Sequence, residues 1–121
     1  MDIKDIYWVA GILEGEGYFA ASNAPYTKTN GERVSRKTAC PIIVLSMTDK
    51  DVIEKFSSIV KKSINGPYQP KKPDGTNGKQ VWTVSLRGKK ALEWMQTIYL
   101  LMGSRRQEKI ESVIKEVCHR P

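Results

Sequence analysis

The 121-residue sequence has too few cysteines and histidines for a disulfide framework or a zinc site. Its two cysteines are Cys40 and Cys118, and its one histidine is His119. A small secreted scaffold usually carries several cysteine pairs. Structural zinc is held by a set of Cys and His ligands at close spacing. We therefore expect free thiols and no structural zinc.

The sequence also lacks a long apolar run and a basic N-terminal start. The longest apolar run covers residues 6–13, far short of the roughly 20 residues that span a bilayer. The chain starts with Met-Asp-Ile-Lys-Asp, unlike the basic start of a secretory signal. We expect a cytoplasmic protein, in the nucleoid or in an organelle matrix according to the host. The length suits a single domain over residues 1–121, and 40% hydrophobic residues can form its core.

Positive charge is concentrated in the second half of the chain. Residues 1–60 hold 7 basic and 8 acidic side chains, whereas residues 61–121 hold 13 and 5. The net charge of +7 therefore comes from the second half. A local excess of this kind attracts polyanions, of which nucleic acid is the commonest, although it can also be a solubilising surface.

Hydrophobic periodicity and turn residues predict an α+β protein with the order α-β-β-α-β-β-α-α. Asn30-Gly31 is typical of a hairpin turn, and Pro41 indicates a bulge or an edge. Ser104 and Gln107 resemble a capping box at the start of the last helix. The expected helices cover residues 3–15, a segment from Thr48 or Asp49 to a stop at residues 65–67, and residues 89–102 and 105–118. The expected strands cover residues 18–21, 33–47, 68–72 and 80–87.

This order implies a sheet of two hairpins with helices on one face and the other face open. The last strand alternates cleanly between apolar and polar residues. Trp82, Val84 and Leu86 should face the helices, and Thr83, Ser85 and Arg87 should face outward. An open polar and basic face is a plausible platform for a DNA groove.

Residues 8–19 form the most informative segment of the sequence. Ala10, Gly11 and Gly15 leave one side of the first helix nearly bare, which allows close approach of another backbone. Glu14 and Glu16 stand at the helix C-terminus, where the helix dipole disfavours carboxylates. A bound Mg²⁺ would reverse that penalty. The alternative is a helix that ends in a solvated acidic turn.

The segment at residues 9–17 resembles the LAGLIDADG motif of homing endonucleases. Ala10, Gly11 and Gly17 match by identity, and Glu14 and Glu16 occupy the two acidic positions. The predicted αββαββα order is also the order of that family. The resemblance therefore implies an antiparallel sheet saddle with helices on one face, and it covers nearly the whole chain.

The resemblance implies a homodimeric, site-specific double-strand DNA endonuclease that uses Mg²⁺. In place of Mg²⁺, Mn²⁺ should support cleavage, and Ca²⁺ should support binding without cleavage. Glu16 would bind the metal with help from the carbonyl of Gly15. The motif helices of two chains would pack together, so that the target is near-palindromic. The implied dimer interface is made of Ala10, Gly11, Glu14 and Gly15.

The resemblance further implies residues that assist hydrolysis and residues that read DNA. Arg105 and Arg106 are candidates to stabilise charge on the phosphate, with plain phosphate anchoring as the alternative. Relatives often carry Gln at the end of the second strand to position water, whereas this chain has Ser46-Met47, so Ser46 is the candidate substitute. The expected DNA contacts are Ser22, Tyr26, Lys28, Asn30, Arg33, Arg36, Thr38, Tyr68, Lys71, Lys72, Thr83, Ser85 and Arg87.

Two alternatives to an endonuclease stay open from the sequence. The first is a non-catalytic binder on the same fold, either an intron-RNA maturase or a DNA-binding regulator. Such a binder needs the basic sheet but not Glu16, and Met47 favours it. The second is a basic scaffold or ribosome-associated protein with no metal and no dimer.

Overall fold

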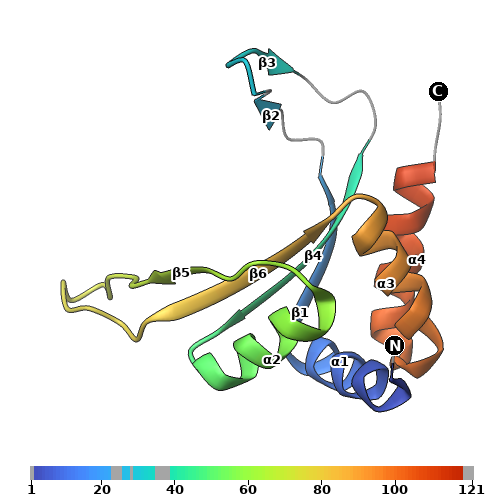
Figure 1. Cartoon of the computed structure of the whole chain (residues 1–121), viewed down its shortest axis with the longest axis horizontal. Helices are drawn as coiled ribbons and strands as arrows, with labels where there is room; N and C mark the ends of the chain where they lie inside the picture. The colour runs from blue at the N-terminus through green and yellow to red at the C-terminus, as the bar shows by residue number, and fades with distance from the viewer. Residues whose placement is uncertain (1, 23–25, 28, 35–38, 119–121) are drawn as a thin grey trace.

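The computed structural model describes residues 2–22, 26–27, 29–34 and 39–118 of the chain. Its main elements follow the predicted order (Figure 1). The helices are α1 (Ile3–Glu16), α2 (Lys50–Val60), α3 (Lys89–Ile98) and α4 (Ser104–Cys118), with the 3-10 turn η1 (Tyr99–Leu101) between the last two. The strands are β1 (Gly17–Ser22), β2 (Tyr26–Thr27), β3 (Arg33–Val34), β4 (Cys40–Met47), β5 (Asn65–Tyr68) and β6 (Val81–Arg87).

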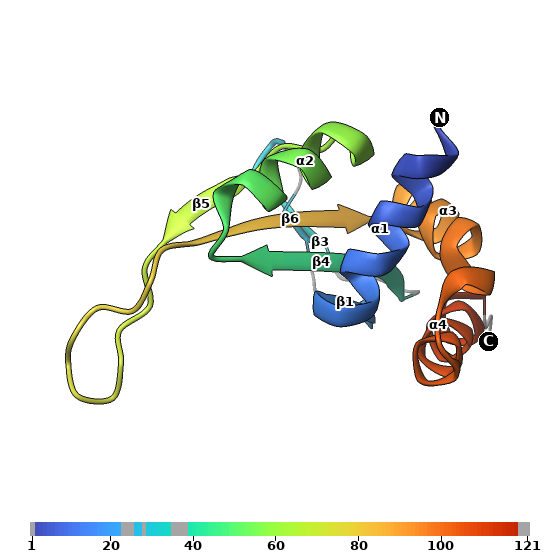
Figure 2. The same ribbon diagram turned by 90° about the horizontal axis from the view of Figure 1, so that it is seen from below.

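Four strands form one antiparallel sheet in the order β1-β4-β6-β5. The neighbours β4 and β6 run in opposite directions along its centre (Figure 2). The short strands β2 and β3 form a separate two-stranded ribbon. This architecture confirms the predicted α+β class with an antiparallel sheet.

The hydrophobic core lies between one face of the sheet and the helices. Alternate residues of β1, β4 and β6 are fully buried and pack with buried residues of all four helices. The sheet residues in this core are Phe19, Ile43, Leu45, Val84 and Leu86. The expected alternation in β6 is therefore confirmed. Within the described ranges, no helix has the length and apolarity needed to cross a membrane.

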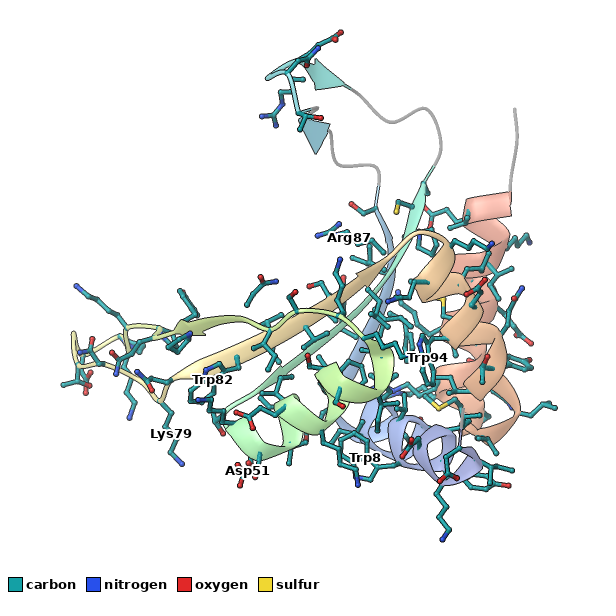
Figure 3. All side chains as sticks on the ribbon, viewed as in Figure 1. Trp8, Asp51, Lys79, Trp82, Arg87 and Trp94 are labelled. Carbon is teal, nitrogen blue, oxygen red and sulfur yellow. The ribbon has the colours of Figure 1, made fainter. Side chains whose placement is uncertain are left out.

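The three tryptophans hold the helices to this core, and Figure 3 labels each of them. Trp94 is buried on α3, and Trp82 packs against the core from β6. Trp8 is half-buried on α1, with the ammonium of Lys55 on α2 4.7 Å from its ring centroid. Trp82 and Trp94 thus take the structural positions expected of large aromatic residues.

Helix α1 leads directly into β1 because the chain changes conformation at Gly17. The helix starts at Asp2, whose side chain accepts a 2.9 Å hydrogen bond from the backbone N–H of Lys4. At its other end, a Cβ on Gly17 would lie 2.7 Å from the carbonyl oxygen of Leu13. Only glycine therefore allows this tight exit, and it fixes Glu16 at the junction of helix and sheet.

The predicted end of the second helix is wrong. Helix α2 ends at Val60, the following residue Lys61 adopts a left-handed conformation, and the expected stop at residues 65–67 lies inside β5. The reason is a tertiary contact, because Lys90 Nζ donates 3.0 Å hydrogen bonds to the carbonyls of Val60 and Lys61. A cation at the C-terminal end of α2 satisfies carbonyls that the helix leaves free.

Two strand boundaries also differ from the prediction. The strand expected at residues 68–72 is β5, which starts at Asn65 and ends at Tyr68. The strand expected at residues 33–47 is divided into β3 and β4. Pro41 produces no bulge, since the register between β1 and β4 is continuous through it. Its carbonyl accepts from the backbone N–H of Gly88 at 2.9 Å, so Pro41 lies at the end of the β4–β6 ladder, where little donor capacity is lost.

The predicted capping box at the start of α4 is also wrong. The carbonyl of Gly103 accepts the first helical hydrogen bond, from the backbone N–H of Gln107 at 2.9 Å. The side chain of Gln107 donates instead to the carbonyl of Tyr99, also at 2.9 Å. Ser104 is therefore already inside the helix.

Candidate active site and nucleic-acid interface

Glu16 lies where the motif helix joins the sheet. It is the last residue of α1, and its neighbour Gly17 pairs with Leu45 in β4. Ser46 follows Leu45, so Glu16 and Ser46 stand at the same end of the β1–β4 ladder. The side chain of Glu16 is exposed, and within the described residues no hydrogen bond or ion pair occupies it. Its carboxylate is therefore available to a ligand.

Glu14, the other acid of the motif, is engaged with α4 of its own chain. Its Oε1 accepts a 2.9 Å hydrogen bond from the backbone N–H of Gly103. Arg106 Nε donates to the backbone carbonyl of Glu14 at 3.1 Å and lies 3.8 Å from Oε2. The Arg106 guanidinium also lies over Phe19, 5.8 Å from the ring centroid. These contacts place a cation at the C-terminal end of α1 and an anion at the N-terminal end of α4, the favourable pairing in each case.

The two candidate arginines therefore differ in their surroundings. Arg106 is mostly buried against Glu14 and Phe19. Arg105 is exposed, and no acidic side chain pairs with it in the described part of the chain. Of the two, Arg105 is the cation that can reach an external phosphate without breaking a contact inside the chain.

The expected interface residues on α1 differ in exposure. Ala10 packs in the core of its own chain and is only 4% exposed. Gly11 and Gly15 lie on the outer side of α1, where an added Cβ would meet nothing within 4 Å. At the same helical spacing, Ile3 and Tyr7 are 60% and 55% exposed. This outer side of α1 suits close packing against another helix.

Ser46 and Met47 lie on opposite faces of the sheet. Met47 packs partly against the core, whereas Ser46 is exposed on the open face. The hydroxyls of Ser46 and its register partner Thr83 share a 2.9 Å hydrogen bond. Asn65 of β5 is paired with Thr83 on its other side, so three polar residues cross the open face in one row. The sequence did not predict this polar row (Ser46, Thr83 and Asn65), since sequence alone does not fix which strands pair.

The expected DNA-contacting residues fall into three regions of the structure. On the open face of the sheet lie Ser22, Tyr68, Thr83, Ser85 and Arg87, with Arg87 labelled in Figure 3. Asn30 and Arg33 belong to the β2–β3 ribbon, where Asn30 Oδ1 accepts a turn hydrogen bond from the backbone of Glu32. Lys71 and Lys72 are exposed in the connection from β5 to β6. Lys28, Arg36, Thr38 and the side chain of Tyr26 lie outside the described residues.

Tyr18 is a further open-face residue that the sequence reasoning missed. It lies two residues after Glu16 on the edge strand β1, is paired with Val44 and is 57% exposed. Its alternation with the buried Phe19 was the available signal. With Arg105, Arg106 and Lys109, it lines a cavity of about 420 Å³ between β1 and α4.

The carboxylates fit a divalent metal only if other ligands join them. In the described ranges, no group of three or more His, Cys, Asp or Glu side chains is arranged to hold a metal ion. Glu14 is committed to Gly103 and Arg106, which leaves Glu16 and nearby backbone carbonyls. Mg²⁺ is commonly held by one or two carboxylates together with phosphate oxygens and waters. The donor set of this chain therefore fits Mg²⁺ in the presence of a phosphate.

Comparisons with known proteins identify the fold. No protein-family model matches the chain, and no curated protein sequence matches it. Among solved structures, the intron-encoded homing endonuclease I-CeuI complexed with DNA has a TM-score of 0.59 and 11% identity, over 93% of this chain and 53% of that one. I-CvuI with its target in the presence of Ca has a TM-score of 0.58 and 11% identity, over 95% and 71% of the two chains.

A third solved structure gives the same result. The LAGLIDADG homing endonuclease I-GzeII in complex with its DNA target has a TM-score of 0.58 and 14% identity, over 91% of this chain and 34% of that one. The chain thus has the fold of LAGLIDADG homing endonucleases, and the predicted resemblance is confirmed for the fold.

Proposed function

We propose that the protein is a site-specific double-strand DNA endonuclease that cuts a long, near-palindromic target as a homodimer with Mg²⁺. The observation that supports this most directly is the exposed carboxylate of Glu16, placed where the motif helix meets the open face of the sheet. Solved structures with the same fold are homing endonucleases bound to DNA. The basic second half of the chain supplies the charge that a DNA backbone requires.

In this proposal, Glu16 and the carbonyl of Gly15 would hold the metal, which lowers the pKa of a water and stabilises the leaving oxygen when it is bound. Arg105, which is exposed and pairs with no acid among the described residues, is the candidate to offset negative charge on the phosphate or to anchor it. Ser46, whose hydroxyl shares a hydrogen bond with Thr83, would orient a water for the reaction. Arg106 holds the end of α1 that carries Glu16.

The proposed dimer brings two such sites together. The outer face of α1 (Ile3, Tyr7, Gly11 and Gly15) combines exposed apolar side chains with two glycines that leave the backbone open. A second copy packed on this face would place its own Glu16 beside the first. A two-fold symmetric pair then presents two equivalent open faces to DNA, which accounts for a near-palindromic target.

Cleavage of a randomised double-stranded DNA library tests this function. With Mg²⁺ or Mn²⁺ the protein should cut one near-palindromic sequence, and with Ca²⁺ it should bind without cutting. Glu16→Gln should lower the cleavage rate at least about 100-fold. Loss of a residue that only hydrogen-bonds to a metal ligand typically costs about 10–100-fold, and loss of the ligand itself should cost no less. Binding should stay within a few-fold of wild type. Glu54→Gln, at an exposed acid on α2, is the matched control and should cut normally.

The other outcomes of this assay are also informative. Specific retention of DNA without cleavage under all three metals would refute the nuclease and indicate a DNA-binding regulator. Retention of structured RNA in place of DNA would indicate a maturase. A Glu16→Gln protein that still cuts at the wild-type rate would remove Glu16 from the site.

A further inference from the structure

The cavity between β1 and α4 carries cationic groups that no contact within the described chain explains. Tyr18 and Phe19 line it from the edge strand, and Arg105, Lys109 and Ser112 line it from α4. Residues 105, 109 and 112 follow one another at helical spacing, so their side chains share one side of α4. The cavity measures about 420 Å³, and it opens beside the exposed Tyr18.

The positive charge in the first turn of α4 would be unfavourable in an isolated helix. The N-terminal end of a helix carries partial positive charge, so acidic residues are favoured there and basic residues are not. The first turn of α4 nevertheless contains Arg105 and Arg106 and no acid. Arg106 is compensated by Glu14, but Arg105 is not paired with any acid in the described residues. A bound anion would remove this mismatch.

Lys109 extends the same positive surface by one helical turn. It is exposed, and no ion pair joins it to the single acid of the cavity, Glu108, within the described chain. Ser112 and the phenol of Tyr18 add hydroxyl donors on either side. Two cations with no acidic partner among the described residues, two hydroxyls and a helix N-terminus together form a donor set suited to phosphate oxygens.

We infer that this cavity binds a phosphate of the nucleic-acid backbone where the strand leaves the open face of the sheet and crosses its β1 edge. The inference rests on the proposed function: it gives Arg105 the phosphate-anchoring role that the sequence left as the alternative, and it adds Lys109 and Ser112 of α4 to that contact at the β1 edge. Tyr18 links the two regions, because it lies both on the open face and in the cavity. Such a contact fixes the register of the DNA relative to Glu16 but reads no base.

The salt dependence of DNA binding tests the inference. Affinity for a duplex would be measured by fluorescence anisotropy between roughly 50 and 200 mM salt. Arg105→Gln and Lys109→Gln should each reduce the magnitude of the negative slope of log K against log salt, by less than the roughly 0.9 that one whole phosphate contact contributes. The double variant removes both cations from the one phosphate and should reduce the magnitude by about 0.9. Lys115→Gln, on the same helix but lining a different groove with Tyr99, is the control of equal charge and should keep the wild-type slope.

Each result of this experiment has a defined meaning. Equal slopes for Lys109→Gln, Lys115→Gln and wild type would overturn the phosphate site while leaving the proposed function in place. Equal reductions of the slope in Arg105→Gln, Lys109→Gln and Lys115→Gln would show a general charge effect and would also overturn the phosphate site. A wild-type protein that binds no duplex would refute both proposals. Calorimetry with inorganic phosphate separates the ligand sources, since saturable binding there with unchanged DNA slopes would indicate a free-anion site instead.

Discussion

The carboxylate of Glu14 accepts a 2.9 Å hydrogen bond from the backbone N–H of Gly103, 89 positions further along the chain. In return, the Arg106 side chain donates to the backbone carbonyl of Glu14 at 3.1 Å. Each helix thus caps the end of the other, since α1 supplies an anion to α4 and α4 supplies a cation to α1. This arrangement holds the turn of α1 that carries Glu16.

Removal of the Glu14 carboxylate should destabilise the fold. Glu14→Ala leaves the N–H of Gly103 without its partner and should lower the free energy of unfolding by about 1–2 kcal/mol. Glu14→Gln keeps an acceptor oxygen and should lose less. Gly103→Ala should resemble Glu14→Ala, because a Cβ at Gly103 would lie 2.5 Å from Glu14 Oε1. Urea denaturation measures all three, and a Glu14→Ala protein as stable as wild type would contradict the proposed cap.

Lys90 should contribute more to stability than its neighbour Lys89. Lys90→Met removes two hydrogen bonds to carbonyls at the end of α2 and should lower the free energy of unfolding by about 1 kcal/mol. Among the described residues, Lys89 forms a single interaction, an exposed 3.8 Å ion pair with Glu93, so Lys89→Met should change stability by less than about 0.5 kcal/mol. Thermal unfolding of the two variants compares them directly, and equal losses would disprove the capping role of Lys90.

The turn between β5 and β6 should loosen in acid. The hydroxyl of Thr76, and then its backbone N–H, donate hydrogen bonds of 2.6 and 3.0 Å to Asp74 Oδ1 and lower the pKa of that carboxyl. Because the pKa is lowered on folding, this contribution is present above the ordinary carboxyl pKa and is lost as the pH falls through the lowered value. NMR titration should show the Asp74 midpoint below the ordinary value and a return toward it in Thr76→Val. An unshifted Asp74 in the wild type would exclude this contact.

Gly11→Ala should have opposite effects on the chain and on the proposed dimer. An added methyl group meets nothing within 4 Å in the single chain, so better helix propensity should raise its stability by about 0.5–1 kcal/mol. The same methyl group would separate two packed α1 helices and should raise the dimer dissociation constant roughly 10-fold, or about 1.4 kcal/mol. Sedimentation and urea denaturation measure the two effects. Unchanged association would place the dimer interface elsewhere.

Thr83 should act through Ser46 in the proposed reaction. Thr83→Val removes the hydroxyl partner of Ser46 Oγ and should lower the cleavage rate roughly 10-fold, as for other outer partners at metal sites. Thr83→Ser keeps a hydroxyl and should restore most of the rate. Both variants should cut the same sequence as wild type. If Thr83 reads a base instead, the preferred target should change at one position in each half-site while the rate on the new target is retained.

Several elements of the fold could be predicted from local sequence. The periodicity and the Asp2 cap define α1, the Asp49 cap defines the start of α2, and the alternation of β6 defines its two faces. These features depend on residues within a few positions of one another, so their physical cause is visible in the sequence. The motif at residues 9–17 indicated the fold in a different way, through its resemblance to the LAGLIDADG family.

The tertiary structure alone decided which charged groups remain free. Arg105 and Arg106 are adjacent and chemically equivalent in sequence, yet only Arg106 meets Glu14 and Phe19. Glu14 and Glu16 differ in the same way, because Glu14 accepts a hydrogen bond from Gly103 and Glu16 does not. The end of α2 depends on Lys90, a distant residue on α3. Each of these outcomes results from contacts between segments far apart in the chain, which form only when the helices pack on the sheet.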